Sequence, residues 1–169
     1  MQINLTQKER MMLEDQKNHE QICIEKYSNY ANQAQCSNLK QIFRENEEAE
    51  RVHLGTINQL LNGTVPQINQ QQGQQQAQQQ SQASSQEQNM TQVQNSNNNK
   101  APGNGLTDKE MCTDVLMTEK YVSGEYDTAI FEFTNPQVRQ ILNHIQKEEQ
   151  QHGEKIFNYM QSNGMYNVQ

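Results

Sequence analysis

The sequence has little of what most functional classes need. Tryptophan is absent, and hydrophobic residues make up only 32% of the 169 residues. No run of about 18 apolar residues occurs, so no integral membrane segment is expected. Residues Met1–Asn4 carry no basic region followed by an apolar core, so we expect no signal peptide. The three cysteines are odd in number and widely spaced, which predicts free thiols rather than a disulfide framework or zinc knuckle.

Basic clusters are also missing. The chain has 13 Lys and Arg against 20 Asp and Glu, a formal net charge of −7. An acidic chain without a basic patch predicts no nucleic-acid partner. The sequence shows neither a nucleophile triad nor a phosphate-binding loop, so no catalytic residue is assigned.

Side-chain amides are abundant instead, with 30 Gln and 20 Asn, and they are unevenly spread. Residues 64–104 hold 15 Gln and 7 Asn but only seven apolar residues. Such a Gln/Asn-rich segment has too little apolar surface to offset the entropy of ordering, which predicts a disordered linker. The other 128 residues hold 47 of the 54 apolar residues, enough for one modest core.

The two flanking segments repeat each other. Leu5–Glu9 (LTQKE) recurs as Leu106–Glu110 (LTDKE), and a match at an offset of 99 residues follows. The equivalent pairs include Glu20 with Glu119, Tyr27 with Tyr126, Glu50 with Glu149 and His53 with His152. We therefore expect a first hairpin over residues 1–63, a linker over 64–104 and a second hairpin over 105–169.

Capping signals predict two helices in each hairpin. Thr6 with Glu9, and Thr107 with Glu110, have the spacing of a capping box, which predicts helix starts. The first helices are expected to end near Gln35 and Phe133. The remaining signals are Ser37 and Asn135 as N-caps, Pro136 at a first helical position, and Gly63 and Gly164 after the last turns. This pattern predicts an all-α, ferritin-like four-helix bundle with a long crossover between the hairpins.

Six ionisable residues share the phase of the apolar positions. They are Glu20, Glu50, His53, Glu119, Glu149 and His152. One Glu from each of two helices and a Glu-x-x-His from each of the other two form the ligand set of dinuclear iron or manganese sites. The alternative is that Glu50 and Glu149 lie on a solvated charged face, with each histidine at a bundle end. His19 and His144 fall off the apolar stripe and are expected at the surface, whereas Tyr27 and Tyr126 are expected in the core with hydroxyl partners.

The second hairpin resembles the coat F family of spore coat proteins from endospore-forming bacteria. The similar segments are Leu106–Glu110, Thr118–Lys120, Thr134–Arg139, Glu148–Gln150 and Ile156–Tyr166. The resemblance implies a ferritin-like fold, a structural role, synthesis in the mother-cell cytoplasm and a location in the spore coat. It also implies other coat proteins, or further copies of the chain, as partners. The family is not defined by a metal site.

Two functions follow from these patterns. The first is a structural component of the endospore coat that contributes to coat assembly and spore resistance, and is not an enzyme. The alternative is a ferritin-like carboxylate protein that holds two iron or manganese ions and handles metal, O₂ or peroxide. If the chain is an enzyme, we expect a di-iron or di-manganese oxidoreductase.

Overall fold

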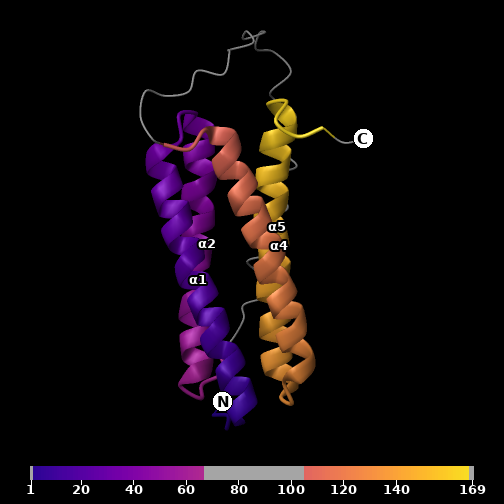
Figure 1. The fold of residues 1–169 in the computed structure, drawn as a ribbon. Coiled ribbons are helices and arrows are strands. Elements are labelled where there is room, and N and C mark those ends of the chain that lie inside the picture. Colours follow the sequence, from indigo (N-terminus) through magenta and orange to yellow (C-terminus); the bar gives the residue numbers. More distant parts are fainter. Residues whose placement is uncertain (1, 67–104, 168–169) are drawn as a thin grey trace, which may run out of the picture. The chain divides into compact units, whose positions relative to one another are not determined.

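Four helices make up the part of the chain that the structure describes. The computed structural model describes residues 2–66 and 105–167. The helices are α1 (Gln7–Gln33), α2 (Ser37–Leu61), α4 (Asp108–Glu132) and α5 (Pro136–Ser162) (Figure 1). Within the described ranges no strand occurs, and the only bridge is an isolated antiparallel one between Gln2 and Thr64. Most of the expected linker, 67–104, lies outside the described residues, so the predicted disorder and the boundaries 1–63, 64–104 and 105–169 stay predictions.

Both predicted capping boxes are confirmed. The Thr6 hydroxyl accepts from the backbone N–H of Glu9, whose carboxylate accepts from the backbone N–H of Thr6 at 2.8 Å. Thr107 and Glu110 form the same reciprocal pair at the start of α4. Each box satisfies N–H groups that have no partner inside the helix.

The start of α2 corrects the prediction for Ser37, which is the first helical residue and not the N-cap. Cys36 is the N-cap, and its side chain makes no capping hydrogen bond. The reason is a contact from the other hairpin: Asp108 accepts from the backbone N–H groups of Gln35 at 2.9 Å and Cys36 at 3.1 Å. The predicted start of α5 is confirmed, since Asn135 accepts from two backbone N–H groups and Pro136 follows it.

Glycines follow the ends of α2 and α5, as expected. Gly63 has φ of 75° and Gly164 has φ of 66°, a left-handed conformation that side chains with a Cβ disfavour. At Gly63 an added Cβ would also lie 3.0 Å from the carbonyl oxygen of Ile3. The backbone N–H of Ile3 donates to the Gly63 carbonyl at 2.8 Å, so the chain start is held beside the end of α2.

The helix directions put the end of α2 and the start of α4 at opposite ends of the bundle. The hydrogen bond of Ile3 puts the end of α2 beside the start of α1, whereas Asp108 puts the start of α4 at the opposite end, beside the α1–α2 turn. The turn between α4 and α5 returns to the first end, where the Thr134 N–H donates to Glu9 at 2.9 Å. The helices pair mainly within hairpins, α1 with α2 and α4 with α5, and α1 also packs on α4. The prediction of an all-α bundle of two hairpins is confirmed (Figure 1).

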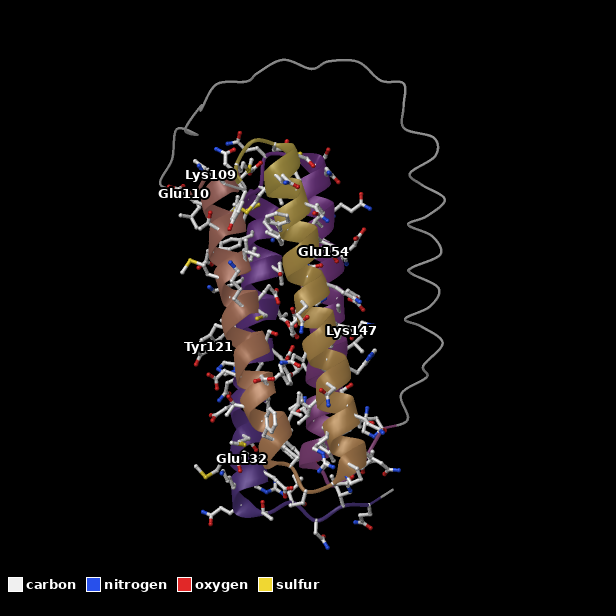
Figure 2. The ribbon with its side chains drawn as sticks, turned by 90° about the vertical axis from the view of Figure 1, so that its right-hand side faces the viewer. Lys109, Glu110, Tyr121, Glu132, Lys147 and Glu154 are labelled. Atoms are coloured by element: carbon white, nitrogen blue, oxygen red, sulfur yellow. The ribbon has the colours of Figure 1, made fainter. Side chains whose placement is uncertain are left out.

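Apolar residues fill the bundle interior, and charged residues such as Lys109, Glu132 and Lys147 lie on its surface (Figure 2). Leu13, Leu39, Phe43 and Ile57 are fully buried. Among the residues that the structure describes, nine polar or charged ones are buried with them: Glu9, Gln16, Glu20, Asn46, Glu50, His53, Glu119, Glu149 and His152. Among the described helices, none has both the length and the apolar character needed to cross a membrane.

Candidate metal centre

The structure brings all six predicted residues together inside the bundle. Their exposed fractions are 0–3%, so Glu50 and Glu149 do not lie on a solvated face. Their donor atoms form two sets, each within 4.8 Å. One set is Glu20, Glu50, His53 and Glu149, and the other is Glu50, Glu119, Glu149 and His152. Glu50 and Glu149 belong to both sets, so the arrangement has the pseudo-twofold symmetry that the repeat predicts.

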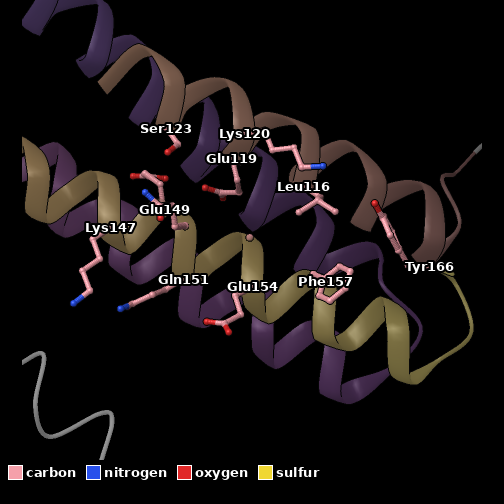
Figure 3. A pocket seen from close by; sticks show the side chains of 12 residues that line it. Leu116, Glu119, Lys120, Ser123, Lys147, Glu149, Gln151, Glu154, Phe157 and Tyr166 are labelled. Carbon is pink, nitrogen blue, oxygen red and sulfur yellow. The ribbon is translucent and has the colours of Figure 1, made fainter. Parts of the chain in front are cut away.

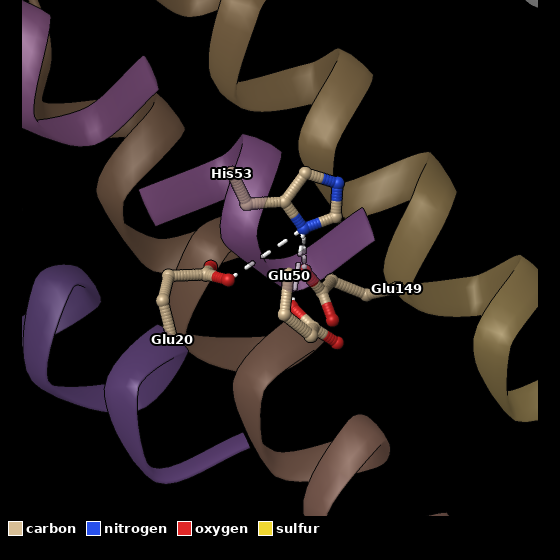
Figure 4. A group of neighbouring side chains, drawn as sticks. All are labelled: Glu20, Glu50, His53 and Glu149. Atoms are coloured by element: carbon tan, nitrogen blue, oxygen red, sulfur yellow. Dashed lines mark hydrogen bonds and ion pairs between the residues drawn. The ribbon is translucent and has the colours of Figure 1, made fainter. Parts of the chain in front are cut away.

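Helical spacing explains why each imidazole meets its carboxylate. Residues three apart lie on one helix face, one turn from each other. His53 Nδ1 therefore lies 3.2 Å from Glu50 Oε2. It also lies 2.9 Å from Glu149 Oε1 on α5 and 3.6 Å from Glu20 Oε2 on α1 (Figure 4). One ring nitrogen thus faces carboxylates from three helices.

His152 repeats this geometry on the other side. Its Nδ1 lies 2.9 Å from Glu50 Oε1, 3.8 Å from Glu149 Oε2 and 3.9 Å from Glu119 Oε2. The two imidazole rings stack with centroids 5.6 Å apart and an angle of 24° between their planes. Both rings point the same type of nitrogen at the shared carboxylates, Glu50 and Glu149.

Several carboxylate oxygens in the cluster form no well-aligned hydrogen bond, although one of them, Glu149 Oε1, lies 2.9 Å from His53 Nδ1. These buried atoms are Glu20 Oε2, Glu119 Oε2 and both oxygens of Glu149. Burial of an unpartnered carboxylate is costly, so such groups take up protons or bind cations. Four carboxylates and two imidazoles match the donors of dinuclear iron or manganese sites, and two divalent ions would neutralise four carboxylate charges. The residues therefore fit a dinuclear site.

Burial also shifts the protonation of the cluster. It raises the pKa of the Glu20 carboxyl to about 8 and, with the charge of Glu50, that of Glu149 to about 7. Burial and the charges of Glu149 and Glu50 raise the pKa of Glu119 well above its usual range. Burial opposes ionisation of Glu50 too, but hydrogen bonds from His152 and His53 outweigh it and lower that pKa. Protons and cations therefore compete for the same carboxylates.

Each hairpin supplies a tyrosine that holds the unshared glutamate of the other. The Tyr27 hydroxyl on α1 donates to Glu119 Oε1 on α4, and the Tyr126 hydroxyl on α4 donates to Glu20 Oε1 on α1. Asn46 Nδ2 in turn donates to the Tyr27 oxygen at 3.2 Å. The prediction that both tyrosines are core residues with hydroxyl partners is confirmed. The signal was present, because each tyrosine follows its equivalent glutamate by seven residues, two helical turns along the same face.

Sequence reasoning missed Glu148 as a partner of the cluster. Its Oε2 lies 2.9 Å from His53 Nε2, the ring nitrogen that points away from the shared carboxylates. This contact would keep a proton on Nε2, so that Nδ1 could bind a metal ion after giving up its own hydrogen bond to the carboxylates. Glu148 neighbours Glu149 but lies off its stripe, so helical phase alone did not select it.

The other histidines and the cysteines lie outside the two sets. His19 is half-buried and its ring packs edge-on against Tyr121, whereas the His144 side chain is 39% exposed. Cys23, Cys36 and Cys112 are free thiols, as predicted. Cys23 is buried near the cluster, where burial and the charges of the glutamates raise its pKa far above its usual value.

A pocket of about 740 Å³ lies between α4 and α5 and ends at the cluster (Figure 3). Glu119 and Glu149 form its inner end. Its other walls include the apolar side chains of Leu116 and Phe157 and the small residue Gly153. No motif in the sequence predicted this pocket, because it depends on which small residues of α4 and α5 face each other.

The second hairpin is similar in sequence to a known protein family. Residues 107–169 match the family of the Coat F domain, a range that includes α4 and α5. The match confirms the resemblance predicted from residues 106–166, and residues 5–62 lie outside it. No curated protein and no solved structure matches the chain.

Proposed function

We propose that this chain, whose second hairpin matches the Coat F domain, is a structural component of the endospore coat that contributes to coat assembly and spore resistance. The Coat F domain indicates a spore coat protein, and that match carries the proposal. The chain would be made in the mother-cell cytoplasm and would assemble with other coat proteins or with further copies of itself. In this role the bundle is a rigid helical unit and has no catalytic task.

A fluorescent fusion to the full chain, followed in sporulating cells, tests the location. The expected signal is a shell around the forespore, together with lower lysozyme resistance in spores that lack the chain. Fluorescence spread through the mother cell, together with unchanged resistance, would contradict the proposal. A Phe43→Asp fusion, which places a carboxylate in the bundle interior, is the control for a folded bundle.

A second candidate function is metal binding, and the six-residue cluster is the observation that favours it. We propose that Glu50 and Glu149 would be shared between two iron or manganese ions, with Glu20 and His53 completing one half-site and Glu119 and His152 the other. The unpartnered buried oxygens support this assignment. A bound pair of such ions would supply Lewis-acid or redox chemistry toward O₂ or peroxide.

The chain's own residues would prepare the site for metal. Tyr27 and Tyr126 hold the unshared glutamates, so two of the carboxylates are oriented before metal arrives. Glu148 fixes the ring orientation of His53. The six side chains are only 0–3% exposed, and this burial strengthens each charge interaction inside the cluster.

Anaerobic loading with Fe²⁺ or Mn²⁺, followed by desalting and elemental analysis, tests metal binding. The expected content is about two ions per chain. Glu149→Ala removes a shared ligand and should lose both ions, whereas Glu48→Ala, an exposed glutamate on α2, should keep them. Fewer than about one tightly bound ion per two chains, unchanged by Glu149→Ala, would exclude the dinuclear site.

A further inference from the structure

The pocket between α4 and α5 touches only one side of the cluster. Its lining includes Glu119 and the shared Glu149, but none of Glu20, His53 and His152, so Glu119 is the unshared residue that the pocket contacts (Figure 3). The pocket therefore approaches the half-site of Glu119 and His152, and the half-site of Glu20 and His53 lies beyond the shared carboxylates.

The inner end of the pocket coincides with the unsatisfied atoms. Of the four buried carboxylate oxygens without a donor, three belong to Glu119 and Glu149. These two residues belong to the cluster and also line the inner end of the pocket. A molecule in the pocket would therefore lie beside three of the four unpartnered oxygens, although the other oxygen of Glu119 accepts from Tyr27.

The two hairpins differ at the positions that open the pocket. Ser123 and Gly153 line it, and an added Cβ at Gly153 would meet Leu116 Cδ1 at 3.7 Å and Glu119 Cβ at 3.8 Å. At the repeat offset of 99, the first hairpin has Ile24, which is buried, and Leu54, which is half-buried. Larger aliphatic side chains therefore stand at the equivalent positions of α1 and α2.

The other half-site is closed by a polar contact as well. Glu148 accepts from His53 Nε2, so both ring nitrogens of His53 already face carboxylates. At the outer part of the pocket, Lys120 on α4 and Lys147 on α5 are exposed, and neither forms a salt bridge with a described residue. Glu154 is also exposed and lines the pocket, so the formal charge of these three outer side chains is +1, which would attract small anions weakly.

We propose that small metal-binding anions, such as azide and the peroxide anion, reach the half-site of Glu119 and His152 through this pocket. The inference rests on the proposed dinuclear site and adds that its two halves are inequivalent. The half-site beside the pocket exchanges ligands, and the half-site of Glu20 and His53 stays closed.

Azide binding to the cobalt-loaded full chain tests the path. Co²⁺ is a spectroscopic substitute for iron or manganese, and azide changes its visible absorption when it binds. Gly153→Leu copies the residue of the first hairpin and should narrow the pocket beside Glu119, where the added Cβ lies 3.8 Å from the Glu119 Cβ. The matched control is Gly55→Leu, since Gly55 is an exposed glycine of α2 and its added Cβ would meet nothing within 4 Å. Both changes favour the helix alike.

The expected result separates metal binding from access. Wild type, Gly55→Leu and Gly153→Leu should hold the same cobalt content, while azide binding should be about tenfold slower or more in Gly153→Leu alone. Full cobalt content with equally fast azide binding in Gly153→Leu, or no azide binding in the wild type, overturns the inference and leaves the dinuclear site standing.

Failure of the site itself gives a different result. A wild-type chain that holds fewer than about one cobalt ion per two chains overturns the dinuclear site and the proposed path together. If Gly153→Leu does not fold, Ser123→Ile replaces it in the test. Ser123 lies on the α4 wall of the pocket, and isoleucine is the residue at the equivalent position 24 of the first hairpin. Azide binding by Ser123→Ile at the wild-type rate would equally exclude this path.

Discussion

The hydroxyl of Tyr27 on α1 donates to the carboxylate of Glu119 on α4, so one hairpin orients a candidate ligand of the other. Tyr126 and Glu20 form the reciprocal pair. Each contact joins residues that are far apart in the sequence and fully buried. The contacts therefore couple the packing of the two hairpins to the geometry of the cluster.

Tyr27→Phe should destabilise the bundle and weaken metal binding. The change leaves Glu119 without its donor and Asn46 without its acceptor, which should lower the free energy of unfolding by about 1–3 kcal/mol. Urea unfolding of the metal-free chain measures the loss. Tyr121→Phe is the control because Tyr121 is 59% exposed and lies on the outer side of α4 (Figure 2). Equal stability of the two variants would show that the buried hydroxyl contributes little.

Glu148→Gln should weaken metal binding without removing a ligand. The charged acceptor at His53 Nε2 is replaced by a neutral amide, so the ring loses both orientation and basicity. Loss of such an outer partner typically lowers metal affinity about 10–100-fold. Competition with a chromophoric chelator measures the affinity. His144→Gln removes only an exposed ring 3.5 Å from the same carboxylate, and its affinity should match the wild type.

Asp108→Ala should loosen the contact between the α1–α2 turn and the start of α4. Asp108 accepts from two backbone N–H groups, at Gln35 and Cys36, in a partly exposed position. We expect a loss of about 1–2 kcal/mol in the free energy of unfolding. Asp108→Asn keeps one acceptor oxygen and should recover part of the loss. If both variants unfold like the wild type, the turn does not depend on this carboxylate.

Glu9 should make the bundle sensitive to acid. Burial alone would raise the pKa of Glu9, but hydrogen bonds from Thr134 and Thr6 outweigh it and lower the pKa below the usual 4.5. A lowered folded-state pKa gives stability that is present above about pH 4.5 and is lost as the pH falls through the folded-state value.

The test of Glu9 compares urea midpoints between pH 6 and pH 3. Glu9→Gln should be less stable than the wild type at pH 6 and should lose less on acidification. Glu14→Gln, an exposed glutamate of α1, is the control and should follow the wild type. An acid loss in Glu9→Gln as large as that of the wild type would assign the effect to other carboxylates.

Helical phase was sufficient to predict the six cluster residues, because an inward position on each helix follows from spacing alone. Phase does not specify which atoms meet across helices, so the pairing of Tyr27 with Glu119 and the contact of Glu148 with His53 required coordinates. The N-cap error at Ser37 has the same cause, since Asp108 comes from another helix. The pocket could not be predicted either, because it depends on the missing side chain at Gly153 and on which residues of α4 face it.

The two ligand sets have a consequence for how the bundle closes. Each set takes residues from both hairpins, so neither hairpin alone contains four donors. A cation that binds only the closed bundle would, above its Kd, shift the free energy of hairpin docking in proportion to the logarithm of its concentration. Under that linkage the metal supply of the cell would regulate how much of the chain is in its assembled form.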